Sequence, residues 1–379
     1  AQGGDAVAAM DDWPVSPSTI DYLFLTHAHI DHIGRVPELI QMGFKGEIIC
    51  SHPTKALLYP MLADAMKFSG IPEQIVRRIE WTIDDLSWGF EYGETFDLEK
   101  GLTFKIGRAG HILGSRFIRF QDERSGSSVL YSGDLGAVDT PILRNPEAPQ
   151  TADLVVMEST YGDRLHEPRD QRVRQLGGVL TRALADSGKV FIPAFSLGRT
   201  QELIYEMDRI FSESAYQALF PDLQGKQRPP VFVDSPLGLK ITKIYSSLSE
   251  YWDREARGLK ERGDHPIDFK GLIAVKDHKD HLKLCDMDGP AIILAGSGMC
   301  TGGRIVNHLQ KGIDDPKNDI LFVGYQAAGT PGRSIQKYSQ RPGGYVDLDG
   351  ERKTIKAGVH TLSGYSAHAD QQGLVDWIE

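Results

Sequence analysis

Short runs of hydrophobic residues recur along the chain, and Asp, Gly, Ser or Pro bounds most of them. Within each run the apolar residues are continuous rather than alternating, which is typical of β-strands covered on both faces. The predicted strands are residues 22–25, 129–131, 154–157, 190–195, 231–233, 291–294 and 320–323.

Helical periodicity occurs between these strands. The clearest case is a set of apolar residues spaced to share one helix face: Leu203, Ile204, Met207, Ile210 and Phe211. Alternating strands and helices predict an α/β protein. At 379 residues the chain is long enough for two domains.

Charge and cysteine content narrow the class of protein. Lys and Arg number 42 and Asp and Glu 52, giving a net charge of −10, which argues against a basic protein that coats nucleic acid without specificity. No apolar run approaches the roughly 20 residues of a membrane helix, and no signal peptide is visible, so we expect a cytoplasmic protein with no membrane partner. Cys50, Cys285 and Cys300 are too far apart for a disulfide framework or a CxxC zinc site.

The first group of candidate metal ligands follows the first predicted strand. Three histidines and an aspartate fall within six residues: His27, His29, Asp31 and His32. Imidazole and carboxylate donors together suit Zn²⁺ and also accept Mn²⁺. A chance cluster in a polar loop would explain one histidine, but it does not explain this spacing. The segment resembles the signature loop of the metallo-β-lactamase superfamily.

Two further candidate ligands occur in the order that this superfamily has. His111 follows a strand-like segment, and Asp134 follows the predicted strand at 129–131. The donors divide into two sites, with His27, His29 and His111 on one metal, Asp31 and His32 on the other, and Asp134 bridging both. We therefore expect two Zn²⁺ ions, with Mn²⁺ as an alternative. Two such ions can share a hydroxide and clamp a phosphoryl group during in-line displacement.

Later motifs narrow the resemblance. Glu158 lies in Met-Glu-Ser-Thr-Tyr-Gly-Asp-Arg, His368 lies in Gly-Tyr-Ser-Ala-His-Ala-Asp, and about two hundred residues separate them. This layout resembles the β-CASP nucleases, which include bacterial ribonuclease J and the endonuclease subunit of the eukaryotic cleavage and polyadenylation factor. The resemblance implies a metallo-β-lactamase αββα sandwich made from residues 1–165 and 360–379. An α/β β-CASP domain would be inserted at residues 166–359.

The resemblance also implies an activity. It predicts a ribonuclease that hydrolyses RNA phosphodiester bonds as an endonuclease, with 5′-exonuclease cutting as a second mode. A hydroxide shared by the metals would attack phosphorus, with Asp31 and Asp134 as catalytic carboxylates. Glu158 would orient His368, which would act as general acid on the leaving oxygen. RNA is the expected partner, and the related bacterial enzymes suggest a homodimer.

A glycine-rich turn in the predicted insert is a candidate phosphate site. Ser297, Gly298, Gly303 and Arg304 lie between a predicted strand and a predicted helix, where backbone N–H groups can face an anion. A tight turn packed against the sheet is the alternative interpretation. Arg199 and Ser235 are further candidates for RNA binding. The charged segment from His278 to His281 is interpreted as a solvated helix face, and His308 is assigned no role.

Two other functions remain open, a β-CASP DNA nuclease and a non-catalytic RNA-binding subunit of an RNA-processing complex. The large insert argues against a small-molecule hydrolase. The resembled family also has an Asp-Cys-Gly motif that would fall before Ala1 and a metal-binding histidine that would fall beyond Glu379. On this comparison we expect the second metal site to lack one ligand in this chain.

Overall fold

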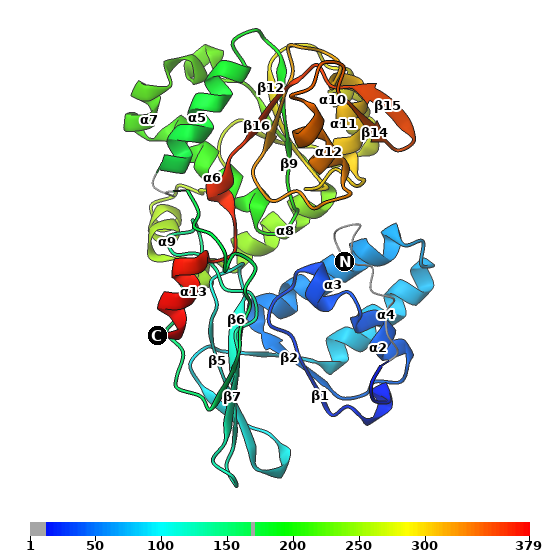
Figure 1. Ribbon diagram of the computed structural model, residues 1–379, viewed down its shortest axis with the longest axis vertical. Helices are drawn as coiled ribbons and strands as arrows, with labels where there is room; N and C mark the ends of the chain where they lie inside the picture. The colour runs from blue at the N-terminus through cyan, green and yellow to red at the C-terminus, as the bar shows by residue number, and fades with distance from the viewer. Residues whose placement is uncertain (1–12, 168–170) are drawn as a thin grey trace. The chain divides into compact units, whose positions relative to one another are not determined.

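The computed structural model describes residues 13–167 and 171–379 (Figure 1). The chain forms two compact units. We call the first the split unit, because it combines residues 13–165 with Ser247–Arg257 and Ala367–Glu379. The second, the inserted unit, combines His166–Ser246 with Gly258–Ser366. The first twelve residues of the predicted 1–165 segment lie outside the described residues.

Two sheets pack together in the described part of the split unit. Strands β1 to β3 form a parallel sheet, whereas β4 to β7 pair antiparallel and β8 pairs parallel with β7. Between the sheets, the Phe24 ring lies 5.1 Å from that of Phe104 and 4.7 Å from that of Phe120. The strands are β1 (Tyr22–Phe24), β2 (Glu47–Ser51), β3 (Ser87–Phe90), β4 (Thr95–Asp97), β5 (Leu102–Arg108), β6 (Arg116–Asp122), β7 (Ser128–Tyr131) and β8 (Leu154–Val156).

Helices cover the outer faces of these two sheets. The longest, α3, begins where Thr54 N–H donates to Ser51 Oγ, and it packs against β2 and β3. At the end of the chain, α13 packs Trp377 against Phe117 of β6, which gives the expected αββα order (Figure 1). The helices are α1 (Ile30–Ile33), α2 (Val36–Gln41), α3 (His52–Phe68), α4 (Glu73–Leu86) and α13 (Gln371–Ile378).

The inserted unit is built around a parallel sheet. Among its described residues the strand order is β11-β10-β12-β9-β13-β16, and β14 with β15 forms a separate hairpin. Strand β12 is buried along its whole length. The strands are β9 (Lys189–Pro193), β10 (Val231–Asp234), β11 (Leu272–Ala274), β12 (Ala291–Ala295), β13 (Asp319–Phe322), β14 (Tyr345–Leu348), β15 (Glu351–Thr354) and β16 (Gly358–Thr361).

Helices connect the strands of this sheet, as parallel strands require, and one further helix precedes β9. They are α5 (Arg172–Ala183), α6 (Arg199–Ser212), α7 (Ser214–Leu219), α8 (Pro236–Ser247), α10 (His278–Asp286), α11 (Arg304–Gly312) and α12 (Pro331–Tyr338), while α9 (Arg254–Glu261) follows α8 in the chain. Of all the helices in the described ranges, none combines the length and apolar character needed to cross a bilayer.

The hydrophobic pattern correctly located seven of these strands and helix α6. Each of the seven predicted strands is present, as β1, β7, β8, β9, β10, β12 and β13, and the predicted helix face is the buried face of α6. The expectation that every strand is covered on both faces is wrong for β8, where Leu154 is 56% exposed and Val156 46% exposed. Strand β8 ends the strand order of its sheet, so it has one neighbouring strand instead of two.

Candidate metal centre

Strand direction brings the candidate ligands of the split unit to one edge of a sheet. Strands β5 and β7 both run antiparallel to β6, and β8 runs parallel to β7, so the carboxyl ends of all three strands point the same way. His111 follows β5, Asp134 follows β7 and Glu158 follows β8. Residues distant in sequence therefore meet because the loops that carry them leave the same sheet edge.

The histidine-rich loop is tied to this edge by hydrogen bonds. His27 and His29 lie between β1 and α1, and Asp31 and His32 lie within the short helix α1. The backbone N–H of Arg116 donates to Thr26 O at 3.0 Å, and Arg116 Nε–H donates to Leu25 O at 2.8 Å. The start of β6 thus holds the loop directly before its first histidine.

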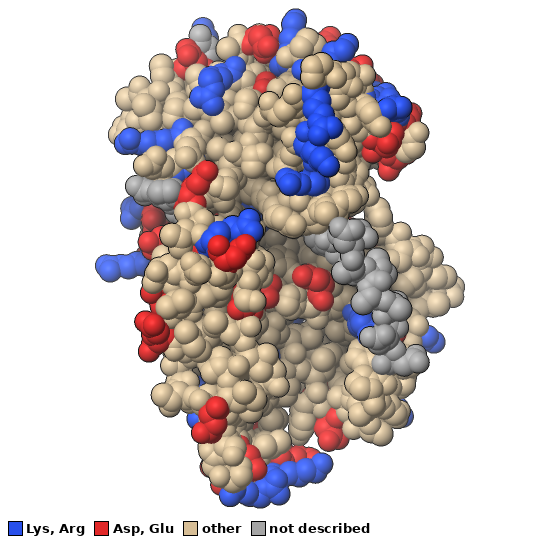
Figure 2. Space-filling model, viewed as in Figure 1, with Lys and Arg blue, Asp and Glu red and all other residues tan. Residues whose placement is uncertain are grey.

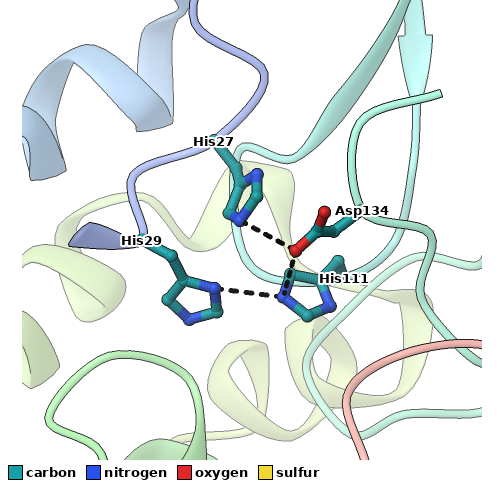
Figure 3. A group of neighbouring side chains, drawn as sticks. All are labelled: His27, His29, His111 and Asp134. Carbon is teal, nitrogen blue, oxygen red and sulfur yellow. Dashed lines mark hydrogen bonds and ion pairs between the residues drawn. The ribbon is translucent and has the colours of Figure 1, made fainter. Parts of the chain in front are cut away.

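Four side chains converge in the centre of this cluster (Figure 3). Asp134 Oδ2 lies 3.5 Å from His27 Nε2 and 3.7 Å from His111 Nε2, and His111 Nε2 lies 3.0 Å from His29 Nδ1. One ligand atom from each of the four residues lies within 4.8 Å of all the others. Such spacing allows all four to face one small ion.

The protonation of these histidines suits a divalent metal. Burial lowers the pKa of His27 and His111 well below the usual value, and burial lowers the pKa of His29 to about 4. The three imidazoles are therefore neutral near pH 7, and each has a lone pair to offer. His27 Nε2 is buried and, within the described residues, has no hydrogen-bond partner. A metal ligated by this nitrogen removes the cost of leaving it unpaired.

The candidates for a second metal are more exposed. His32 Nε2 lies 3.3 Å from Asp134 Oδ2 and 3.7 Å from Asp31 Oδ2, and the Asp31 side chain is 54% exposed. Burial lowers the pKa of His32, but the hydrogen bond to Asp134 and the charges of Asp134, Asp31 and Glu158 together outweigh burial, so the net shift is upward. Asp134 thus lies between the buried histidines and this more open pair.

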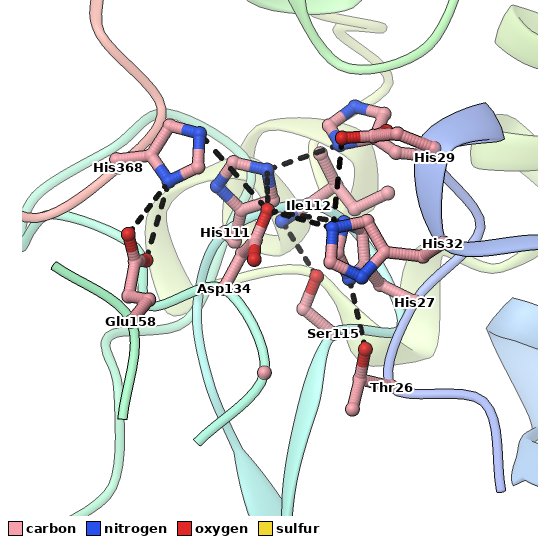
Figure 4. A network of polar contacts seen from close by, with 12 residues as sticks. Thr26, His27, His29, His32, His111, Ile112, Ser115, Asp134, Glu158 and His368 are labelled. Carbon is pink, nitrogen blue, oxygen red and sulfur yellow. Dashed lines mark hydrogen bonds and ion pairs between the residues drawn. The ribbon is translucent and has the colours of Figure 1, made fainter. Parts of the chain in front are cut away.

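Glu158 and His368 form a pair beside the cluster (Figure 4). His368 Nδ1 lies 3.1 Å from Glu158 Oε2 and 3.2 Å from Glu158 Oε1, and His368 Nε2 lies 4.0 Å from Asp134 Oδ2. Burial lowers the pKa of His368, but the hydrogen bond and charge of Glu158, together with the charges of Asp134 and Asp31, outweigh burial, so the pKa is raised overall. The imidazole is therefore oriented by one carboxylate and turns its other nitrogen toward the metal ligands.

The candidate phosphate-binding residues lie in the inserted unit. Gly303 is the N-cap of α11, with φ of 75°, and a Cβ there would lie 2.6 Å from Gly296 O. Ser297 Oγ accepts a hydrogen bond from Thr301 N–H at 2.9 Å, and a Cβ on Gly298 would lie 2.8 Å from the Phe195 ring. These contacts describe a compact turn at the start of a helix. A side chain at Gly303 would press against the backbone, and a side chain at Gly298 would press against the Phe195 ring.

The other candidates of the inserted unit already have partners within the protein. Arg304 Nη1 donates to Asp234 Oδ1 at 2.7 Å and to Val275 O at 3.0 Å. Arg199 pairs with the Glu202 carboxylate, and Ser235 Oγ accepts from Gly238 N–H at 3.0 Å near the start of α8. Each of these residues therefore has a local structural contact in addition to any contact with RNA.

Comparison with known families identifies this arrangement. A sequence model of the metallo-β-lactamase superfamily matches residues 3–194, and that of the β-CASP domain matches residues 200–335. The chain belongs to the β-CASP group of the metallo-β-lactamase superfamily. It is therefore a metal-dependent hydrolase. The model of a Zn-dependent metallo-hydrolase RNA specificity domain matches residues 352–379 of this β-CASP protein.

Relatives of this β-CASP protein come from all three domains of life. A ribonuclease of Thermus thermophilus is 37% identical over 363 residues, which cover 96% of this chain and 80% of the relative. The transcription termination factor FttA of Methanococcus maripaludis is 31% identical, covering 95% of this chain and 56% of the relative. Cleavage and polyadenylation specificity factor 73 of Drosophila melanogaster is 30% identical, covering 99% of this chain and 52% of the relative. The chain thus spans little more than half the length of the last two.

Proposed function

We propose that this β-CASP protein is a zinc-dependent ribonuclease that cuts RNA phosphodiester bonds internally and also from the 5′ end. The observation that carries the proposal is the Glu158–His368 pair, placed 4.0 Å from Asp134 in the metal centre. A hydrolase that needs only a metal-activated water has no use for an imidazole such as His368, which lies beside the metal ligands and is oriented by its own carboxylate. A nuclease needs one, because its alkoxide leaving group must be protonated.

The ligand set supports zinc as the metal. His27, His29, His111 and Asp134 would hold one ion, while Asp31, His32 and the shared Asp134 would hold a second. Bound there, the metals would stabilise negative charge on the phosphoryl oxygens and activate water near pH 7. Imidazole-rich sets favour Zn²⁺, and Mn²⁺ is the alternative because carboxylates also contribute.

The chain's own groups would handle the proton. Glu158 accepts a hydrogen bond from His368 Nδ1, which fixes the ring and favours its protonated form. His368 Nε2 would then donate its proton to the departing 3′ oxygen. Leu135 N–H donates to Glu158 Oε1 at 2.5 Å, which holds the carboxylate in place while the imidazole changes charge.

A basic and aromatic surface of the inserted unit supports RNA as the substrate. Arg341 lies 5.3 Å from the Tyr338 ring and Arg352 lies 3.3 Å from the Tyr345 ring, while the two rings are parallel within 6°. Figure 2 shows Lys and Arg side chains gathered over α12, the helix that ends at Tyr338. Tyr345 is 42% exposed, whereas Tyr338 is half-buried against the core, so the cations offer phosphate contacts and Tyr345 offers the more accessible ring to a base.

The test combines metal analysis with cleavage of a 5′-labelled RNA. The wild-type protein is compared with His29→Ala and Asp134→Ala, and His52→Ala is the control. All four proteins are purified by the same procedure. His52 lies in the same unit, but its exposed ring is outside the metal cluster. We expect both cluster variants to lose metal and at least about 10³-fold in rate, whereas His52→Ala keeps both.

Paired substrates separate the alternatives. RNA and DNA of one sequence are cut side by side, and preference for DNA would replace this proposal with the DNA nuclease. Full metal occupancy without cleavage of either substrate would favour the non-catalytic RNA-binding subunit. A role in cytoplasmic RNA processing and a homodimer complete the proposal, and light scattering after size exclusion tests the dimer.

A further inference from the structure

Two helices of the protein carry many charged residues, and their faces differ. On α10 the neighbours of His281 are charged, but His281 itself is fully buried, and its Nδ1 lies 2.6 Å from Asp234 Oδ2. The interpretation of the segment up to His281 as a solvated face is therefore wrong for this residue. Helix α4, in contrast, turns Val76, Ile79 and Ile83 inward against α2, α3 and β2, and its opposite face is exposed to solvent.

The exposed face of α4 is centred on a tryptophan. Trp81 is 78% exposed, so most of a large apolar side chain contacts water. An α-helix turns once in 3.6 residues, so positions three and four residues before and after Trp81 share its face. Arg77 and Arg78 occupy the positions before it, Asp84 and Asp85 occupy those after it, and all four are exposed. The face therefore has a basic half and an acidic half with an aromatic ring between them.

The acidic half is unfavourable for the helix alone. Asp84 and Asp85 lie in the last turn of α4, which contains no basic residue, and the carboxyl end of a helix dipole repels negative charge. Lys55 Nζ lies 3.9 Å from Asp84 Oδ1, too far for a hydrogen bond, and the Asp84 side chain is 84% exposed. A cation that approaches this turn from outside would relieve the repulsion.

The order of charges makes the face complementary to a second copy of itself. A two-fold axis perpendicular to α4 at the level of Trp81 makes the two helices antiparallel, so the arginines of each copy face the aspartates of the other. A parallel pair would instead bring like charges together. We propose that two copies of this β-CASP protein associate through α4, with their Trp81 rings packed at the axis. This inference rests on the homodimer of the proposed function and gives it an interface.

The interface is small, and unlike charges direct its formation. The net charge of −10 makes two chains repel each other at long range, so association needs a surface where unlike charges meet. Arg77 pairs with Glu73 at 2.6 Å within the chain, but an exposed pair of this kind exchanges partners at little cost. An interface centred on one helix is smaller than the roughly 1,200 Å² of stable complexes. We therefore expect a reversible dimer with a Kd on the order of micromolar, which rises with salt.

Charge reversal tests the interface by sedimentation velocity on the 379-residue chain. The double variants are Arg77→Glu with Arg78→Glu, and Asp84→Lys with Asp85→Lys. Each has a face of one sign, so we expect the Kd of each to rise at least about tenfold. An equimolar mixture of the two variants should restore the dimer, because an acidic face then meets a basic one. Trp81→Ala should weaken the wild-type dimer at least about tenfold, as the loss of a central aromatic residue does.

Matched controls separate the interface from the fold and from net charge. Glu and Lys are good helix formers, and lysines in the last turn of α4 suit the helix dipole better than the native aspartates, so the double variants keep the helix. Lys279→Glu with Lys283→Glu changes two exposed cations on α10 and alters the net charge as much as the arginine variant does. Leu219→Ala removes an exposed apolar side chain from α7. Both controls should leave the dimer intact.

The outcomes distinguish this inference from the other proposals. A wild-type protein that stays monomeric well above micromolar concentration would overturn both the interface and the homodimer. A dimer that survives either double variant, or a mixture that stays monomeric, would overturn the interface alone. A higher KM for RNA in the arginine variant without a change in association would assign the face to RNA instead. Association is measured without substrate, so a protein that does not cleave RNA still gives a decisive result.

Discussion

Glu158 makes two kinds of contact at once. Its Oε1 accepts a hydrogen bond from Leu135 N–H, the residue after Asp134, and both of its oxygens face His368 Nδ1. Its own backbone N–H donates to Ser132 Oγ at 3.0 Å. One side chain therefore links the loop that carries a candidate metal ligand to the imidazole that would act as acid.

Replacing Glu158 by Gln should separate these two contacts. The amide oxygen can still accept from Leu135 N–H, but it no longer supplies the charge that favours protonated His368. We expect kcat for RNA cleavage to fall by about 10²–10³-fold, with KM and metal content unchanged. Steady-state kinetics with metal analysis measures this.

The matched control for this variant is Asp163→Asn. Asp163 is an exposed carboxylate paired with Arg164 shortly after Glu158, and its loss should change kcat by less than about twofold. The double variant Glu158→Gln with His368→Ala should be no slower than His368→Ala alone, because the two residues act as one unit. Additive losses would contradict that assignment.

At the scale of elements, the metal centre depends on a close approach of two loops. Gly110 bridges to Leu135, and Gly136 bridges to His368, so the loops after β5 and β7 and the segment before α13 touch through their backbones. A Cβ on Gly136 would lie 2.0 Å from Gly110 O and 2.6 Å from His111 N. The absence of a side chain at Gly136 is therefore a requirement for bringing His111 near Asp134.

Gly136→Ala tests that requirement. We expect the loops to separate, which should lower the free energy of unfolding by about 1–3 kcal/mol and reduce metal binding. Gly162→Ala is the control, since a Cβ there would make an ordinary contact 3.4 Å from Ser159 O. Thermal unfolding and metal analysis of both variants decide the matter, and equal metal content in the two would refute the role of the close approach.

Within the inserted unit, helix α6 carries a buried carboxyl group. Burial, and to a smaller extent the nearby charge of Asp264, raises the pKa of Asp208 from 3.8 to about 7. When the pKa of a carboxyl is higher in the folded state than in the unfolded state, the protein loses stability as the pH rises from the unfolded-state pKa to the folded-state pKa. Stability of the inserted unit should therefore decline between about pH 4 and pH 7 on account of this group.

Asp208→Asn should remove this dependence. At pH 8 the variant should have a higher free energy of unfolding than the wild type, by an amount on the order of 1–3 kcal/mol, and the difference should be much smaller at pH 5. Unfolding scans at the two pH values measure it. An advantage of equal size at both pH values would show that titration of this carboxyl is not the cause.

For the whole molecule, the net charge of −10 opposes binding to RNA, so affinity must come from a local group of cations. The described surface that best fits this need is the basic and aromatic group around Tyr338 and Tyr345, with Arg341 and Arg352 beside the rings. Phosphate contacts of this kind weaken as salt rises, whereas stacking depends little on salt.

Arg341→Gln and Arg352→Gln should raise KM for RNA while kcat stays unchanged. Each substitution should reduce the slope of log KM against log salt by about one if the residue contacts a phosphate. Arg78→Gln, an exposed cation on α4, is the control and should leave the slope unchanged. A change in kcat without a change in KM would exclude a binding role for this surface.

Local sequence by itself was enough to place seven of the strands, helix α6 and the histidine-rich loop. Strand and helix signals arise from neighbouring residues, and His27, His29, Asp31 and His32 lie so close in sequence that one loop must carry them all. The order of motifs then indicated the family, and with it the expectation that Glu158 and His368 would meet although 210 residues separate them.

Only the tertiary structure decided which residues from distant elements come into contact. Nothing local distinguishes His281 from an exposed residue, because Lys279, Asp280 and Lys283 make α10 look solvated all round, and the helix still turns one face to the sheet. The link from Asp234 through His281 to Cys285 and His308 joins a strand to two helices, so no sequence window contains it. Periodicity depends on adjacent residues, whereas a buried cluster of this kind depends on the packing of elements far apart in the chain.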